Sequence, residues 1–282
     1  MNQKSETAKG YAAAIVTAIL WSLGGLLIKL IPWSAMSINA ARCLVALLVK
    51  IAMRRSLKVH FTPSILLAAF CFFGTTLLFV FANKLTTAAN AIVLQYSSTL
   101  FIIALTWIFL KRRPSGVDLV SSVLIIAGIA LCCFDNLTTD GALGNVLALC
   151  SGLTFGSMLF INAQGGGKNA DDANYLGFII GVLVGLPSLA RETDFSLPVV
   201  GYIVILGAFQ LGFAYIFLEY ALKRISALSA NIVCSFEPIL NPVWVALIYG
   251  ETIGPLAIGG GLLVIASVVF YGIMNARRTK VA

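Results

Sequence analysis

The sequence predicts an all-α integral membrane protein, in which ten transmembrane helices form two inverted five-helix repeats around a central cavity. Three observations point to this fold class: the composition, the spacing of long apolar stretches, and an internal repeat. Apolar residues make up 60% of the 282 residues and charged residues only 11%, and the mean hydropathy is +0.98. Soluble domains contain about half apolar and about a quarter charged residues, so we expect most of this chain to lie in a lipid bilayer.

Each expected helix is an apolar stretch long enough to cross the hydrocarbon core, which takes about 20 residues. The stretches are 10–31, 34–53, 63–83, 87–110, 116–134, 142–162, 173–190, 198–222, 226–254 and 255–276. The N-terminus before them is short and polar, and no small-residue cleavage site follows the first stretch. We therefore interpret that stretch as a retained helix.

An internal repeat sets the expected architecture. Residues 87–134 resemble residues 226–276 at an offset of about 140 residues. A unit of five helices has an odd number of crossings, so the second unit enters the membrane in the opposite orientation, as inverted repeats of secondary transporters do. The expected halves are residues 1–134 and 142–282, and the connection 135–141 is too short to separate soluble domains. We expect one integrated membrane domain.

Basic residues in the connections predict the orientation in the membrane. Fifteen lysines and arginines lie on the side that holds both termini, against three on the other side, namely Lys29, Lys84 and Arg191. Both termini are therefore expected to be cytoplasmic, in a multi-pass protein of the cytoplasmic (inner) membrane.

Composition and motifs argue against several function classes. The net charge of +8 is spread over short clusters between apolar stretches, which does not suit nucleic-acid binding. The six cysteines all lie inside apolar stretches, without disulfide or metal-ligand spacing. His60 is the only histidine and lies in a loop, which excludes zinc-protease and Ser-His hydrolase sites. Residues 165–168 lack the flanking residues of a phosphate-binding loop. We expect no enzyme activity, cofactor, metal ion or nucleic-acid partner.

The stretch 226–254 holds the main candidate site, because Glu237-Pro238 and Asn241-Pro242 interrupt an otherwise apolar span. Each proline removes a backbone donor and frees a carbonyl one turn earlier. Lipid cannot satisfy such groups, so the break should face protein or a watery cavity. A carboxylate at that depth marks a solute or ion pathway, which makes Glu237 the candidate for coupling. The alternative is that Glu237 is a permanently bonded structural group.

Arg42 is the second charge expected near the middle of the bilayer. Its depth allows an ion pair with Glu237, and an unpaired charge would be costly there. One interpretation is that Arg42 tethers its helix to carbonyls or to Glu237. The other is that it binds a solute carboxylate, with Asn39 one turn away on the same face. Elsewhere, Glu219 stands four residues before Lys223, a spacing that predicts a surface ion pair.

Further residues are candidates for the wall of the cavity. In 87–110, Gln95 and Tyr96 are expected to face the cavity, while Ser98 and Thr99 pack against other helices. Tyr96 aligns within one residue of Glu237 in the repeat, which predicts that the two meet at the centre. The remaining candidates line the cavity or only pack in the core; they are Trp21, Phe79, Gln210, Tyr215 and Phe236.

With these residues the chain resembles the drug/metabolite transporter superfamily, specifically its ten-helix EamA-type members, over nearly its whole length. The resemblance lies in the duplicated unit, in the Glu-Pro of 226–254 followed by Gly250-Glu251, and in the counterpart stretch 81–98. It implies a basket of ten helices, with a cavity lined mainly by the first, third, fourth, sixth, eighth and ninth. It also implies transport of small organic solutes across the inner membrane, often outward. The four-helix relatives carry an essential carboxylate in their first helix; 10–31 has none, so their proton-exchange mechanism is not carried over.

Three functions are open at this point. The preferred hypothesis is a secondary transporter that exports small organic metabolites by alternating access. The alternative within transport is an uptake carrier or facilitator for an amino acid or vitamin. The alternative of another class is a non-transporting membrane scaffold subunit, which would not need polar residues to converge on one cavity. The sequence leaves open the solute, the direction, proton coupling and a homodimer.

Overall fold

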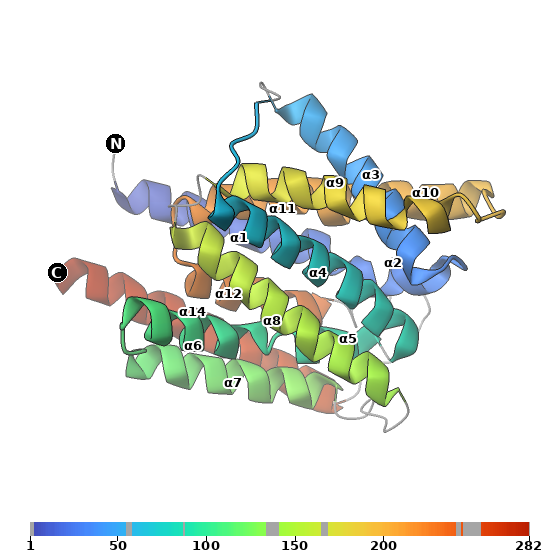
Figure 1. Cartoon of the computed structure of the whole chain (residues 1–282). Coiled ribbons are helices and arrows are strands. Elements are labelled where there is room, and N and C mark those ends of the chain that lie inside the picture. The colour runs from blue at the N-terminus through green and yellow to red at the C-terminus, as the bar shows by residue number, and fades with distance from the viewer. Residues whose placement is uncertain are drawn as a thin grey trace.

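The computed structural model describes residues 3–54, 58–86, 88–133, 141–164, 169–240, 244 and 255–281. In these ranges every regular element is helical, as predicted. The helices form a bundle in which the start of α1 and the end of α14 lie at the same end (Figure 1). We call this end the terminal end, and the other the opposite end.

The elements are α1 (Gln3–Trp21), α2 (Gly24–Leu30), α3 (Ala35–Met53), α4 (Pro63–Leu85), α5 (Ala88–Gln95), α6 (Ser98–Leu110), α7 (Gly116–Cys133), α8 (Ala142–Gln164), α9 (Ala170–Leu189), α10 (Leu197–Ile205), η2 (Leu206–Phe213), α11 (Ala214–Leu222), α12 (Ala227–Cys234) and α14 (Pro255–Val281).

Local sequence signals set where several of these helices begin. Ser34, Thr62 and Ser226 are extended, and each accepts a hydrogen bond from the backbone N–H three residues on. They satisfy donors that a helix leaves free in its first turn.

Six helical segments are long and apolar enough to cross a membrane; they are Ser5–Leu30, Ala35–Met53, Pro63–Leu85, Ala142–Gln164, Ala170–Leu189 and Leu197–Leu222. The shorter apolar helices are Ser98–Leu110, Gly116–Gly128, Ala227–Leu240 and Ile258–Tyr271. Large apolar side chains such as Leu48, Phe70 and Trp107 are exposed on the surface of the bundle, while Arg42 and Tyr96 are buried inside it. This is the polarity of a bundle that lipid surrounds, and the count of ten crossings stays a prediction.

Several of the expected spans are interrupted, although the sequence predicted a break only in 226–254. The first span turns at Ser22-Leu23 between α1 and α2, and 87–110 turns at Tyr96-Ser97 between α5 and α6. The span 198–222 contains the π-helical segment η2. In 226–254, α12 ends at Cys234 and the chain is helical again over 237–240. Pro242 and most of the rest of that stretch lie outside the described residues.

The helices of the two expected halves pack against one another instead of forming separate lobes. α4 packs along α8, α3 along α9, α7 along α14, and α1 along α11. η2 also lies against α3, and Gly207 makes this close approach possible, because a Cβ there would lie 2.8 Å from the carbonyl oxygen of Arg42. A centre built from both halves follows from this packing.

Candidate functional site

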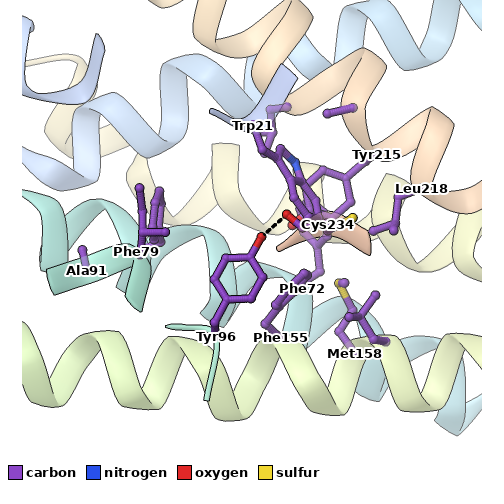
Figure 2. Close-up of a cluster of buried hydrophobic side chains, with 14 of the residues drawn as sticks. Trp21, Phe72, Phe79, Ala91, Tyr96, Phe155, Met158, Tyr215, Leu218 and Cys234 are labelled. Carbon is purple, nitrogen blue, oxygen red and sulfur yellow. Dashed lines mark hydrogen bonds between the residues drawn. The ribbon is translucent and has the colours of Figure 1, made fainter. Parts of the chain in front are cut away.

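The two helix breaks nearest the centre face each other. Pro238 has no N–H, so it cannot bond to the carbonyl of Cys234 four residues earlier. The hydroxyl of Tyr96, at the turn between α5 and α6, donates to that carbonyl oxygen at 2.5 Å (Figure 2). The carbonyl that the proline frees is therefore satisfied by a side chain from the other half.

Glu237 joins this contact. Its Oε2 lies 3.0 Å from the hydroxyl of Tyr96, so the meeting of these two residues that the repeat alignment predicted is present. Both side chains are buried, with 2% of Tyr96 and 4% of Glu237 exposed. The tyrosine hydroxyl thus connects a backbone carbonyl and a carboxyl group at the same helix break.

Amide and hydroxyl side chains extend the contact on both sides. Asn231 of α12 accepts from Ser98 Oγ at 3.2 Å and donates to Thr99 Oγ1 at 2.7 Å. Gln95 donates to Ser151 Oγ of α8 at 2.7 Å, and Ser151 donates to the carbonyl of Thr75 at 3.0 Å. The packing role expected for Ser98 and Thr99 matches these contacts, while Gln95 bonds across to the second half.

A cavity of about 30 Å³ lies beside this contact. Its walls come from α1, α3, α4, α5, α8, η2, α11 and the segment 237–240, and the residues that line it are Trp21, Arg42, Thr75, Thr76, Phe79, Gln95, Phe155, Gln210, Leu211, Tyr215 and Glu237. Trp21 lies 5.4 Å, between ring centroids, from both Phe155 and Tyr215 (Figure 2). A cavity of this size has room for about one or two water molecules, not for an organic solute.

Arg42 is held in the cavity wall by neutral acceptors. Its Nε and Nη2 donate to Asn39 Oδ1 at 3.3 and 3.2 Å, and Nη2 donates to the carbonyl of Thr76 at 2.6 Å. Its Nη1 donates to Gln210 Oε1 at 3.4 Å. The ion pair with Glu237 that their depths allow is not formed: within the described ranges, the ion pairs involve other residues.

Most of the predicted site residues come together here. Seven of them line the cavity, and Asn39 and Tyr96 contact lining residues directly. Phe236 is half-buried and is not among the lining residues. The sequence interpretation missed Thr75, Thr76, Phe155 and Leu211. Only Thr75-Thr76 left a signal, as adjacent polar residues in the middle of an apolar span.

A second group of charges closes the terminal end. Lys50 Nζ, in the last turn of α3, lies 2.5 Å from Glu219 Oε1 of α11 and 2.7 Å from Asp171 Oδ1 of α9. Asn174 donates to Glu219 Oε1 at 2.8 Å. The predicted surface pair of Glu219 with Lys223 is wrong, because Glu219 is only 4% exposed and faces Lys50. Helical spacing cannot show that a partner from another helix lies closer.

Arg54 and His60 continue this group. Arg54 pairs with Asp171, at 3.2 Å from Nε to Oδ2, and with Asp172. His60 Nδ1 lies 2.9 Å from Asp172 Oδ2. Despite these acidic side chains, no cluster in the described part of the chain could hold a metal ion. The carboxylates instead form ion pairs with basic side chains, and these ion pairs connect α3 to α9 and α11.

The opposite end is closed by bonds to backbone groups. Lys29 donates to the carbonyl of Thr86 at 2.9 Å, and Lys84 donates to that of Ile31 at 2.5 Å. Trp33 Nε1 donates to the carbonyl of Asp194 at 2.8 Å, and the backbone N–H of Ser34 donates to Glu192 Oε1 at 3.0 Å. The last two contacts join the first half to the second.

A bundle of apolar helices around a buried polar cavity defines a multi-pass membrane protein of the transporter kind. The EamA-like transporter family matches residues 8–134 and 142–273, so the chain belongs to this family and carries two of its domains. The family expected from the sequence is thereby confirmed. Its members are transporters and not enzymes, and this chain is a membrane transporter of small solutes.

Curated relatives and a solved structure agree with this assignment. Solute carrier family 35 member G1 of Homo sapiens is 25% identical over 282 residues, covering 92% of this chain and 77% of that protein. An "uncharacterized transporter" of Clostridium kluyveri is 25% identical over 204 residues, covering 68% of this chain and 66% of its own length. A crystal structure superposes with a TM-score of 0.79 over 97% of this chain and 99% of its own, at 16% identity, which shows the fold alone.

We expect Tyr96→Phe to lower the free energy of unfolding by about 1 kcal/mol, because it leaves the carbonyl of Cys234 without its donor. The measurement is reversible unfolding in mixed detergent micelles. Tyr202→Phe, on α10 outside the cavity wall, is the matched control. An effect of Tyr96→Phe no larger than that of the control would contradict the role given to the hydroxyl.

For the terminal end, we expect a double-mutant cycle to show strong coupling between Lys50 and Glu219. Glu219→Gln and Lys50→Met should each cost about 3 kcal/mol, since each leaves a buried charge with a weakened counterion. The double variant should lose clearly less than the sum of the two. The exposed pair Lys9–Glu6 serves as the control cycle, with much smaller coupling. Additive losses at Lys50 and Glu219 would show that the buried contact is not an energetic unit.

Proposed function

We propose that the protein is a secondary transporter that exports small organic metabolites across the cytoplasmic membrane by alternating access between two inverted halves. The observation that carries this proposal is the central cavity, which takes its lining from four elements of the first half and four regions of the second. A scaffold subunit would not need this convergence. The outward direction rests on the resemblance to EamA-type exporters.

The size of the cavity supports a cycle with more than one state. Pockets for organic ligands measure about 300–1,000 Å³, far above the 30 Å³ found here. A solute therefore requires the walls to separate. The breaks at Ser22-Leu23, Tyr96-Ser97 and Ser235-Phe236 place short helical pieces around the cavity, and helix ends of this kind can absorb the backbone changes of a hinge.

In such a cycle, the contacts that close the terminal end and the opposite end of the bundle act as gates. At the terminal end, Lys50 and Arg54 of the first half pair with Asp171, Asp172 and Glu219 of the second. Opening that end must separate these groups, and water entering the gap then solvates the separated charges. The opposite end is held by weaker contacts to backbone groups. Alternating access follows when one set opens while the other stays closed.

Transport itself is tested with the purified protein inserted in one known orientation in proteoliposomes. Amino acids, nucleosides, organic acids and vitamins are supplied as a mixture, and movement in each direction is followed by mass spectrometry. We expect at least one compound to cross faster than in protein-free liposomes. Gln95→Ala should slow it by about fivefold, the effect of one lost hydrogen bond, while Trp107→Ala on the lipid face should not. Movement of no compound would contradict the proposed transport, and exclusively inward movement would overturn the outward direction and support the uptake carrier.

Proton coupling through Glu237 is the finer part of the proposal. The hydroxyl of Tyr96 has one hydrogen, yet its oxygen contacts both the Cys234 carbonyl and Glu237 Oε2. Both contacts are hydrogen bonds at the same time when Glu237 is protonated. Its carboxyl group then donates to the hydroxyl oxygen of Tyr96, and that hydroxyl donates to the carbonyl oxygen of Cys234. Among the described residues, the other titratable or charged groups near Glu237 are Arg42 and Tyr215, in the same cavity wall, and the thiol of Cys234.

We expect Glu237→Gln to fold and to transport without the pH response of the native protein, because the amide N–H replaces the donor of a protonated carboxyl group but cannot titrate. Initial rates between pH 5 and pH 9, with and without a proton gradient, provide the measurement. An unchanged pH profile and an unchanged response to the gradient would make Glu237 a structural group.

A further inference from the structure

We propose that the solute is a small organic monoanion with a flat apolar body, and that Arg42 binds its carboxylate. This inference rests on the proposed transport function and adds the substrate class. Its basis is a contrast within the chain: among the described residues, two basic side chains are buried, Arg42 at 1% and Lys50 at 2% exposed. Lys50 has two carboxylates within 2.7 Å, whereas the acceptors around Arg42 are all neutral.

The charge of Arg42 is therefore matched by dipoles alone. A buried charge in a membrane protein is costly unless an opposite charge accompanies it. If Arg42 only tethered α3 to α4 and η2, a neutral amide or hydroxyl could make the same contacts without that cost. A single positive charge is neutralised by a single negative charge, which favours a monocarboxylate over a phosphate with its higher charge.

The hydrogen bonds of the guanidinium leave one edge available. It has five hydrogens, and those on Nε and Nη2 are directed to Asn39 and to the carbonyl of Thr76. Among the described residues, Nη1 contacts only Gln210, at 3.4 Å, which leaves its second hydrogen for a ligand. Gln210 also lines the cavity, so a carboxylate can displace its side-chain oxygen while Asn39 and Thr76 keep Arg42 in place.

The rest of the wall sets the shape of the solute. Trp21, Phe79, Phe155 and Tyr215 present four aromatic rings to the cavity, and two of them, Phe155 and Tyr215, contact the ring of Trp21 (Figure 2). Flat apolar groups pack well against such rings. An ionised Glu237 in the same wall would repel a carboxylate, so the anion enters with Glu237 protonated, the state in which both contacts of Tyr96 are hydrogen bonds.

The substrate class is tested by thermal unfolding of the purified protein with three matched sets of probes at equal concentration. The first set is phenylacetate, 3-phenylpropanoate and indole-3-acetate; the second is their primary amides, and the third the amines phenethylamine and tryptamine. We expect carboxylates to raise the Tm and the amides and amines to leave it unchanged. Equal shifts from amides or amines, or no shift from any carboxylate, would overturn the proposal.

Two variants assign the effect to Arg42. Arg42→Gln should weaken carboxylate binding at least about tenfold, the value of one lost charged hydrogen bond. Gln210→Glu places a carboxylate beside Nη1, so we expect it to raise the Tm of the empty protein and to abolish the shift by the probes. Arg113→Gln removes an exposed positive charge and should change neither property. If Arg42→Gln does not fold, the Gln210→Glu variant alone tests the role of Arg42. If Arg42 were merely structural, the carboxylate probes would raise the Tm of that variant as much as they raise the Tm of the native protein.

The same probes separate this inference from transport. Amides or amines that bind and cross proteoliposome membranes would leave the transport function standing and refute the anion class. Carboxylates that bind through Arg42 but never cross would support the site and contradict transport.

Discussion

The centre of this protein depends on the absence of water in the bilayer core. Pro238 leaves the carbonyl of Cys234 without its helical donor, and lipid offers none. The hydroxyl of Tyr96 supplies that donor from a helix break in the other half. This requirement places the two breaks face to face, brings Glu237 within 3.0 Å of the same hydroxyl, and fixes the position of the cavity between the halves.

The buried basic side chains at the terminal end and at the centre of the bundle differ in the groups that balance their charge. At the terminal end, Lys50 and Arg54 meet carboxylates from α9 and α11, so the closure is electrically balanced and can separate as a unit. At the centre, the acceptors that Arg42 meets in the described part of the chain are all neutral. The balanced group suits a gate, and the unbalanced one suits a site that an anionic solute completes.

The sequence predicts an all-helical membrane protein well, because the length and polarity of the apolar stretches follow directly from the thickness of a bilayer. It also predicts that Tyr96 and Glu237 meet, through the repeat. It does not reveal the break at Tyr96-Ser97, where no proline or glycine marks the turn, and it misassigns Glu219, whose partner Lys50 is 169 residues away. Such contacts depend on how helices pack, and helical spacing contains no information about that.

We propose that one cavity, shared by both halves, opens alternately to the two sides of the membrane. Accessibility of a cysteine at Thr76, a lining residue that is 3% exposed, tests it most directly. Thr76→Cys, in a variant without the six native cysteines, is treated with an impermeant thiol reagent in right-side-out and in inside-out vesicles. If access alternates, the cysteine is labelled from both sides, and transported solute protects it. Labelling from one side only, or from neither, would contradict alternating access through this cavity.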